Sequence, residues 1–201
     1  MKTLSRSKDS YVRPLVLGCS MILMLCVCAF AQNKFVGVDG IVYGAKAAFY
    51  FRAPDGWVVD PISGQKHGFN GVLYPKDSSW ADAETVMYAD VEDDFTDATA
   101  FAANRVEDQK RRHHCVAKEK VASGKTKDDE AYFINEYPAT AIYTRWERVA
   151  YIQLPGAVGY VVLSSRNEES YRKDNHMLEE VMKTIHHMTV HLGREGSVSS
   201  Q

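Results

Sequence analysis

The sequence predicts an α+β fold in which helices flank a largely antiparallel β-sheet. Three observations lead to this prediction: β-prone segments recur along most of the chain, two segments show helical spacing of apolar residues, and short turns separate the strand candidates. The order is strands, a helix, a run of strands and a final helix. This order is typical of helices packed on an antiparallel sheet.

The amino terminus has the features of a secretory signal peptide. Basic residues precede the apolar run LVLGCSMILMLCVCAFA, which closes on Ala29-Phe30-Ala31, a small-x-small cleavage site. We therefore expect residues 1–31 to be removed and the protein to be exported, either to the periplasm or as a secreted product. The alternatives are an uncleaved membrane anchor, since the run approaches a bilayer's thickness, and lipid attachment at Cys19. A membrane would then be a partner only through the uncleaved segment.

The composition after cleavage limits the partners. Residues 32–201 hold 20 Lys and Arg against 25 Asp and Glu, and they retain one of the four cysteines. An acidic surface argues against nucleic acid, because phosphate binding needs clustered bases. One cysteine allows no internal disulfide, so the core must stabilise the fold. We expect a single domain over residues 32–192, followed by a flexible polar tail over residues 193–201.

The first strand is predicted over residues 47–53, where Phe49 and Phe51 would share one face. Pro54-Asp55-Gly56 ends it, because proline cannot extend a ladder and glycine adopts backbone angles that other residues avoid. Trp57 follows this turn. A large apolar side chain at that position is best used to close the end of a core, so we interpret Pro54, Gly56 and Trp57 as a structural motif.

Further strands are predicted at 70–74, 85–91, 131–137, 140–153 and 159–164. The segment LPGA, residues 154–157, predicts a hairpin turn between the last two.

Two segments have helical spacing. The first, residues 96–114, repeats apolar residues every three or four positions, and either Asp94 or Thr96 could cap it. The second, residues 169–188, carries an apolar stripe that we expect to pack on the sheet. The stripe consists of Tyr171, Leu178, Val181, Met182, Ile185 and Met188.

The stretch FYFRAPDGWVVD, followed by GFNGVLYPKDSSWADAETVMYADV and a helix, resembles the α/β-sandwich group that includes the PsbP extrinsic proteins of photosystem II and the Ran-binding Mog proteins. The resemblance covers residues 47–188 as an order of elements, and its local signature is Pro54-Asp55-Gly56-Trp57. It implies an α/β/α sandwich that acts as a binding or assembly module, without a shared catalytic set. The same sandwich occurs in bacterial envelope proteins and in immunity proteins of secreted toxins.

Three residues are candidates for a binding surface: Trp80, Tyr74 and Arg145. Aromatic and arginine side chains supply large contact areas at binding hot spots. Trp80 is expected to be exposed, because the segment DSSWADA around it is polar, and an exposed tryptophan marks a contact surface.

Two groups of residues could bind metal or react. Cys115 ends the segment RRHHC and could be a reactive thiolate or metal ligand, but it also begins an apparent strand, so we prefer a buried structural cysteine. His187 and His191 have the i, i+4 spacing that could hold zinc on a helix, although the Glu of a zinc-protease motif is missing; we prefer surface histidines. The acids at 90–95 and 125–130 lack calcium-loop spacing, and we expect them to be solvated.

The sequence holds no nucleophile elbow and no glycine-rich phosphate cradle, so we predict neither an enzyme nor a cofactor. The preferred hypothesis is an exported, non-catalytic binding or assembly module of the cell envelope, with a protein or small ligand as its partner. One alternative is a metal- or thiol-dependent protein that uses Cys115 and the histidines. The other is an immunity-type inhibitor of a secreted toxin.

Overall fold

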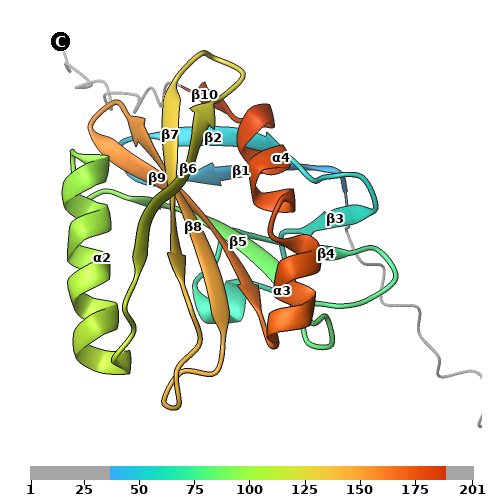
Figure 1. Ribbon diagram of the computed structural model, residues 1–201. Coiled ribbons are helices and arrows are strands. Elements are labelled where there is room, and N and C mark those ends of the chain that lie inside the picture. Colours follow the sequence, from blue (N-terminus) through green and yellow to red (C-terminus); the bar gives the residue numbers. More distant parts are fainter. Residues whose placement is uncertain (1–36, 189–201) are drawn as a thin grey trace, which may run out of the picture. The chain divides into compact units, whose positions relative to one another are not determined.

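The computed structural model describes residues 37–188, which form an antiparallel sheet with helices on both faces (Figure 1). The signal peptide predicted over residues 1–31 and the tail predicted over residues 193–201 lie outside the described residues. The α+β prediction is confirmed. The strands are β1 (Asp39–Tyr43), β2 (Ala48–Arg52), β3 (Trp57–Asp60), β4 (Gly71–Pro75), β5 (Thr85–Glu92), β6 (Lys118–Lys125), β7 (Ala131–Tyr137), β8 (Trp146–Leu154), β9 (Ala157–Ser165) and β10 (His186–Met188). The helices are α2 (Ala98–His113), α3 (Glu168–Asp174), α4 (Met177–Thr184) and the short 3-10 helix η1 (Gln65–His67).

The strands form two sheets. The larger has seven strands in the order β3-β4-β5-β9-β8-β7-β6, and every neighbouring pair is antiparallel. The smaller has the order β1-β2-β10 and is also antiparallel. In the β8–β9 hairpin, Leu154 pairs with Ala157, and Gly156 has a φ of 73°, which confirms the predicted turn. Glycine suits this position because it has no Cβ to clash at positive φ.

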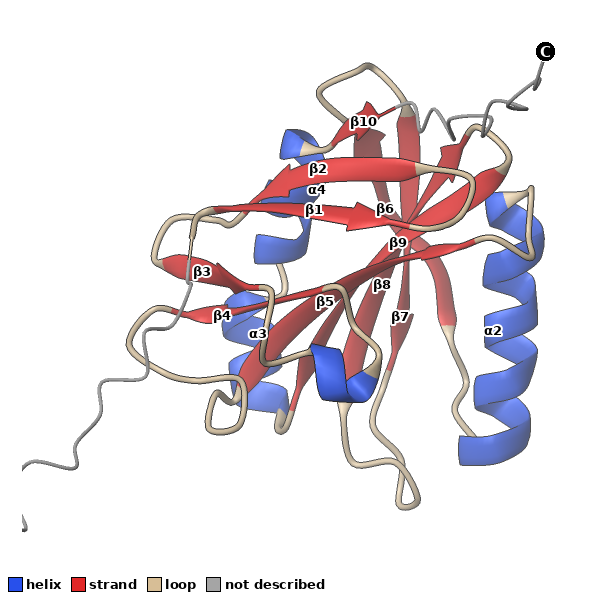
Figure 2. Ribbon diagram, turned by 180° about the vertical axis from the view of Figure 1, so that it is seen from behind, coloured by secondary structure: helices blue, strands red, loops and turns tan. Residues whose placement is uncertain are grey.

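Successive side chains of the central strands point to opposite faces of the large sheet, and both faces are buried. The sequences of these strands are therefore nearly continuous apolar runs. Val149 and Tyr151 belong to a cluster beneath α2. Ala150 and Ile152, on the opposite face, belong to the main core with α3, α4 and the smaller sheet. Figure 2 shows β1 and β2 crossing the strands of the larger sheet on the same side as α4.

The main core includes Phe49 and Phe51 of β2 and Trp57 at the start of β3. Trp57 is 6% exposed, so the tryptophan after the Pro-Asp-Gly turn does contribute to the core. The two sheets approach closely at Gly159, where an added Cβ would lie 2.8 Å from Ile152 and 3.1 Å from Phe49. A side chain there would push the smaller sheet away.

The prediction of one final helix over residues 169–188 is wrong in its bounds. It is two helices, α3 and α4, and α4 ends at Thr184. Ile185 is already extended, and β10 then pairs with β2, His186 opposite Tyr50 and Met188 opposite Ala48. Pairing with a strand far away in the sequence overrides the local helical spacing here. Met188 is 40% exposed and falls outside the apolar stripe.

Three further boundaries differ from the predictions. The cap of α2 is Asp97, whose Oδ1 accepts from the Ala100 amide at 2.8 Å, rather than Asp94 or Thr96. Strand β8 begins at Trp146, six residues after the predicted start. Strand β6 begins at Lys118, three residues after the apparent strand predicted from Cys115. Strands β1, β3 and β10 were not predicted.

Candidate functional site

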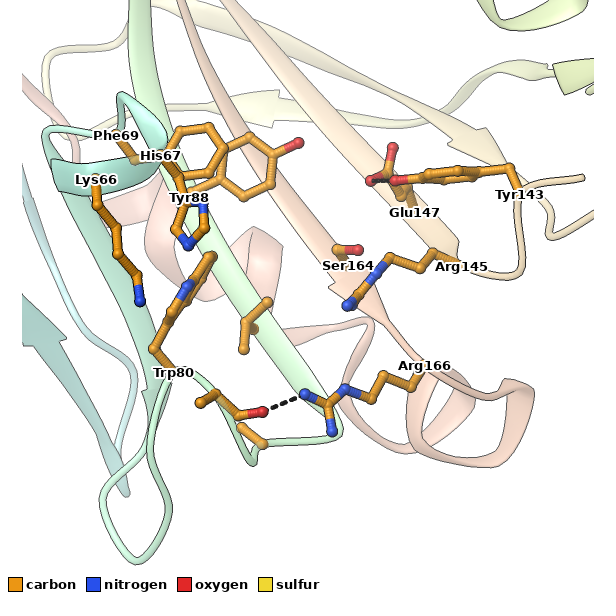
Figure 3. Close-up of a pocket in the computed structure, with 13 residues that line it drawn as sticks. Lys66, His67, Phe69, Trp80, Tyr88, Tyr143, Arg145, Glu147, Ser164 and Arg166 are labelled. Carbon is orange, nitrogen blue, oxygen red and sulfur yellow. Dashed lines mark hydrogen bonds between the residues drawn. The ribbon is translucent and has the colours of Figure 1, made fainter. Parts of the chain in front are cut away.

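A cavity of about 540 Å³ opens on the face of the large sheet that carries α2 (Figure 3). Its lining comes from β5, β8 and β9, from η1, and from the segments that adjoin these elements in the sequence. This volume lies within the usual range of small-molecule sites.

Sheet register fixes the floor of the cavity. Ser164 of β9 lies opposite Val86 of β5 on one side and opposite Glu147 of β8 on the other. The three residues therefore form one row across adjacent strands, and all three line the cavity. Side chains directly opposite in an antiparallel pair lie within about 5.5 Å of each other, so the row is a continuous surface.

One wall of the cavity is aromatic. The ring of Phe69 stacks on Tyr88 with centroids 4.1 Å apart, and Trp80 meets Phe69 edge-on at 6.1 Å. Burial raises the pKa of Tyr88 to about 12, so its hydroxyl stays protonated at neutral pH. This wall offers a large flat apolar surface, which suits an aromatic or apolar group.

The acidic residue on the floor of the cavity is already paired with a cation. Glu147 is buried, and it accepts hydrogen bonds from Arg105 Nη2 at 3.2 Å and from the Tyr143 hydroxyl at 2.7 Å. Burial, together with the charge of Glu147, raises the pKa of Tyr143, which keeps the phenol a donor. A buried carboxylate paired with a guanidinium contributes little net charge to its surroundings.

Three cations remain at the cavity, namely Lys66, Arg145 and Arg166. None of them forms an ion pair with a residue in the range 37–188. Arg166 is held in place by donating to the Ala81 carbonyl. Figure 3 shows Arg145 and Arg166 on the side of the cavity facing Trp80. The cavity is therefore cationic, and it combines this charge with an aromatic wall.

The predicted binding residues have different positions in the structure. Trp80 and Arg145 both line the cavity, although they lie 65 positions apart in the sequence. The expectation of a surface contact at Tyr74 is corrected: Tyr74 is 1% exposed, and its hydroxyl donates to Asp60 Oδ2 at 2.8 Å. The segments around Phe69 and Trp80 fold over β4, which buries Tyr74 in a small cluster.

Sequence reasoning missed Lys66, Tyr88, Tyr143, Glu147 and Arg166. The basic-aromatic loop GQKHGF was a usable signal for Lys66, because loops beside strands often carry binding residues. Tyr88 and Glu147 are placed by strand register, and Tyr143 and Arg166 lie in segments next to β8 and β9; no local pattern reveals that these residues meet.

Cys115 is buried, and its Sγ donates to the Pro138 carbonyl at 3.3 Å. Burial raises the pKa of the thiol, and the charge of Glu147 raises it further. Both effects disfavour the thiolate, which is the reactive form. Cys115 does not begin a strand as predicted, because β6 starts at Lys118.

The histidine prediction is also corrected. His187 lies in β10 rather than on a helix, so the i, i+4 geometry does not apply, and His191 lies outside the described residues. The acids of segment 125–130 are not simply solvated. A ring nitrogen of His187 and one carboxylate oxygen each from Asp128 and Glu130 lie within 4.8 Å of one another.

Within residues 37–188, no helix is both long enough and apolar enough to span a membrane.

No protein-family model matches the chain, and no curated protein matches it. Among solved structures, it is similar to the solution structure of cyanobacterial PsbP (CyanoP) from Synechocystis sp. PCC 6803, with 15% identity and a TM-score of 0.47. The similarity covers 81% of this chain and 98% of that one. That solved protein bears the name of the PsbP group, which the Pro-Asp-Gly-Trp turn and the element order resemble; the Mog part of the resemblance stays a prediction.

Proposed function

We propose that the protein is a non-catalytic binding module whose cavity takes a small anionic ligand with an aromatic or apolar body. The observation that supports this proposal is the combination of three cations outside any described ion pair with an aromatic wall, above a floor whose acid is already paired. The chain as a whole has a formal net charge of −2, so a cationic cavity is a local feature rather than a consequence of composition.

The chemistry of the lining matches such a ligand. Arginine binds carboxylate, sulfate or phosphate groups through strong charge-assisted hydrogen bonds, and Arg145 and Arg166 approach the cavity from neighbouring elements. Trp80 and Phe69 can contact a flat apolar group. A ligand carrying both features would be oriented, with its charge toward the arginines and its body against the aromatic wall.

Binding fits the lining better than catalysis does. The cavity holds one hydroxyl and one imidazole in addition to its tyrosines, from Ser164 and His67. Figure 3 shows His67 on the aromatic side, with η1, and Ser164 beside Arg145. Nucleophilic catalysis needs a base within hydrogen-bond reach of the nucleophile, and the two groups come from different sides of the cavity.

We also propose that the module acts after export, with its ligand or partner in the cell envelope. The support is the basic, apolar and small-residue sequence of residues 1–31. Amino-terminal sequencing of the protein isolated from its own cells should find Gln32 as the first residue. A mature protein that starts at Met1 would contradict cleavage.

Paired fluorescent probes test the cavity directly. 8-Anilino-1-naphthalenesulfonate is an aromatic anion, and N-phenyl-1-naphthylamine has nearly the same rings without the sulfonate. At roughly 0.3 kcal/mol for each of about 21 non-hydrogen atoms, the anion should bind with a Kd of tens of micromolar. We expect the neutral probe to bind at least about tenfold more weakly, since a charge-assisted hydrogen bond contributes about 1.5 to 3 kcal/mol.

Single-residue variants test whether the anionic probe binds in the cavity. Arg145→Ala and Trp80→Ala should each weaken binding of the anion about tenfold or more, and Arg145→Ala should reduce the preference over the neutral probe. Arg112→Ala is the matched control, because Arg112 is an exposed arginine on α2 whose ion pair with Asp108 lies at the surface. Equal binding of both probes, or equal effects of Arg145→Ala and Arg112→Ala, would contradict the proposal.

A further inference from the structure

The turn between β6 and β7 lies against the last strand of the smaller sheet, away from the cavity. Figures 1 and 2 both show this turn beside β10. Two hydrogen bonds from backbone amides join the segments: Lys127 donates its amide to the Ile185 carbonyl at 3.2 Å, and the His187 amide donates to Asp128 Oδ2 at 2.8 Å. Residues about 58 positions apart in the sequence are thereby held together.

This contact gathers metal-ligand atoms of two kinds, from Asp128, Glu130 and His187, here called the hairpin cluster. One ligand atom of each residue lies within 4.8 Å of the other two, and Nδ1 of His187 is 3.3 Å from Oε1 of Glu130. Two ligands bound to one tetrahedral Zn²⁺ at about 2.1 Å lie roughly 3.4 Å apart. The three atoms are therefore spaced close to the separation that coordination of one ion requires.

One oxygen of the hairpin cluster is buried without a partner. Oε2 of Glu130 makes no hydrogen bond with any described residue. A buried acceptor without a partner costs stability, and a bound cation would remove that cost.

A neighbouring histidine orients one of the acids. Nδ1 of His186 lies 2.6 Å from Oδ1 of Asp128. Its other carboxylate oxygen, Oδ2, accepts from the His187 amide. Asp128 is therefore held in place through both of its carboxylate oxygens. Such outer contacts orient ligands in metal sites.

We propose that Asp128, Glu130 and His187 form a binding site for a divalent transition metal of the Zn²⁺ class. Two carboxylates and a neutral imidazole carry a charge of −2, which the ion would balance. A ligand set of one imidazole and two carboxylates suits Zn²⁺ and similar transition metals, whereas Ca²⁺ is coordinated by six to eight oxygen atoms rather than by nitrogen. The three side chains are each about a quarter exposed, which leaves the site open to an entering ion and to water as a further ligand.

Isothermal titration of the metal-free protein with ZnCl₂ tests the site. We expect one Zn²⁺ per chain, and we expect His187→Ala and Glu130→Gln each to weaken binding at least about tenfold. Glu130→Gln is nearly isosteric, so it removes the charge while keeping the turn, and thermal melts verify that both variants fold. His176→Ala and Glu169→Gln are matched controls, because both residues are exposed in the α3–α4 region, and they should bind as the parent protein does.

Two further measurements separate this site from a merely acidic turn. Co²⁺ should give visible absorption bands of a nitrogen- and oxygen-ligated ion, and His187→Ala should abolish or shift them. Ca²⁺ should bind far more weakly than Zn²⁺. Absence of Zn²⁺ binding, equal affinity for Ca²⁺, or binding unchanged in both His187→Ala and Glu130→Gln would overturn the proposal. The anionic-probe assay uses a different site, so either proposal can fail without the other.

Discussion

Replacing Trp57 with alanine should strongly destabilise the protein, because this side chain closes the main core at the start of β3. Trp57 is 6% exposed, and it packs in the cluster that includes Phe49, Phe51 and Val59. A buried aromatic side chain removes roughly 200 Å² from water. At about 25 cal/mol per Å², truncation loses about 4 kcal/mol after allowance for the methyl group that remains.

The position of β3 in the sheet determines how large the loss of unfolding free energy is within the expected range. Large-to-small changes at buried aromatic residues cost about 3 to 5 kcal/mol, and the cost is lower where neighbours can collapse into the space. β3 is an edge strand of the large sheet, and β4 is the one strand of that sheet with which it pairs. Neighbouring side chains can therefore move partly into the space that the indole leaves. For a domain of this size, a loss of about 4 kcal/mol lowers the Tm by roughly 8 to 16 °C.

Urea unfolding and thermal melts of three variants check this reasoning. Trp57→Phe keeps an aromatic ring in the core and should lose about half as much stability or less. Trp80→Ala is the matched control, because Trp80 is only partly buried, at the cavity wall, and should lose about 1 to 2 kcal/mol. A Tm unchanged by Trp57→Ala, or a greater loss from Trp80→Ala, would refute the structural role of the tryptophan after the turn.

Two further predictions concern buried ionisable groups. Burial opposes the charge of Asp60, but hydrogen bonds from Ser63, Tyr74 and the Ile62 amide outweigh it and hold the pKa of Asp60 below its usual value. The resulting stabilisation is present above the unfolded pKa of about 3.9 and is lost as pH falls through the lower folded value. Asp60→Asn should therefore lower the free energy of unfolding more at pH 7 than near pH 3; an equal loss at both would contradict this. Cys115, buried and with a raised pKa, should react with a disulfide reagent at least about a hundredfold more slowly in the folded protein than in denaturant, and comparable rates would disprove its burial.

Local pattern was sufficient for the elements whose side chains alternate or repeat. The predicted ranges for β2, β4, β5, β7 and β9 agree with the structure to within two residues, because each of these strands places apolar residues on a buried face. β6 was expected to begin at Cys115, and its bounds were misplaced because it is the polar outer strand of the large sheet, with most of its residues exposed. An edge strand needs no apolar alternation, so its sequence carries no periodic signal.

The sequence indicated individual residues of the candidate site, but not that these residues lie together. The polar surroundings of Trp80 and the hot-spot tendency of arginine singled out Trp80 and Arg145, but neither pattern indicated that the two line one cavity. Their proximity depends on the register that places Val86, Ser164 and Glu147 in one row. Register is set by pairing between strands that lie far apart in the chain, and that information is absent from any single segment.

By itself, the sequence determined the α+β class, most of the central strands, the first helix and the core position of Trp57, since these depend on local periodicity and on turn chemistry. Only the tertiary structure decided that His187 lies in a strand beside Asp128 and Glu130, that Tyr74 is buried, and that three cations line one cavity with an aromatic wall. The physical reason is that burial, charge pairing and ligand geometry depend on distances between segments, and chain folding fixes those distances through packing of the whole core.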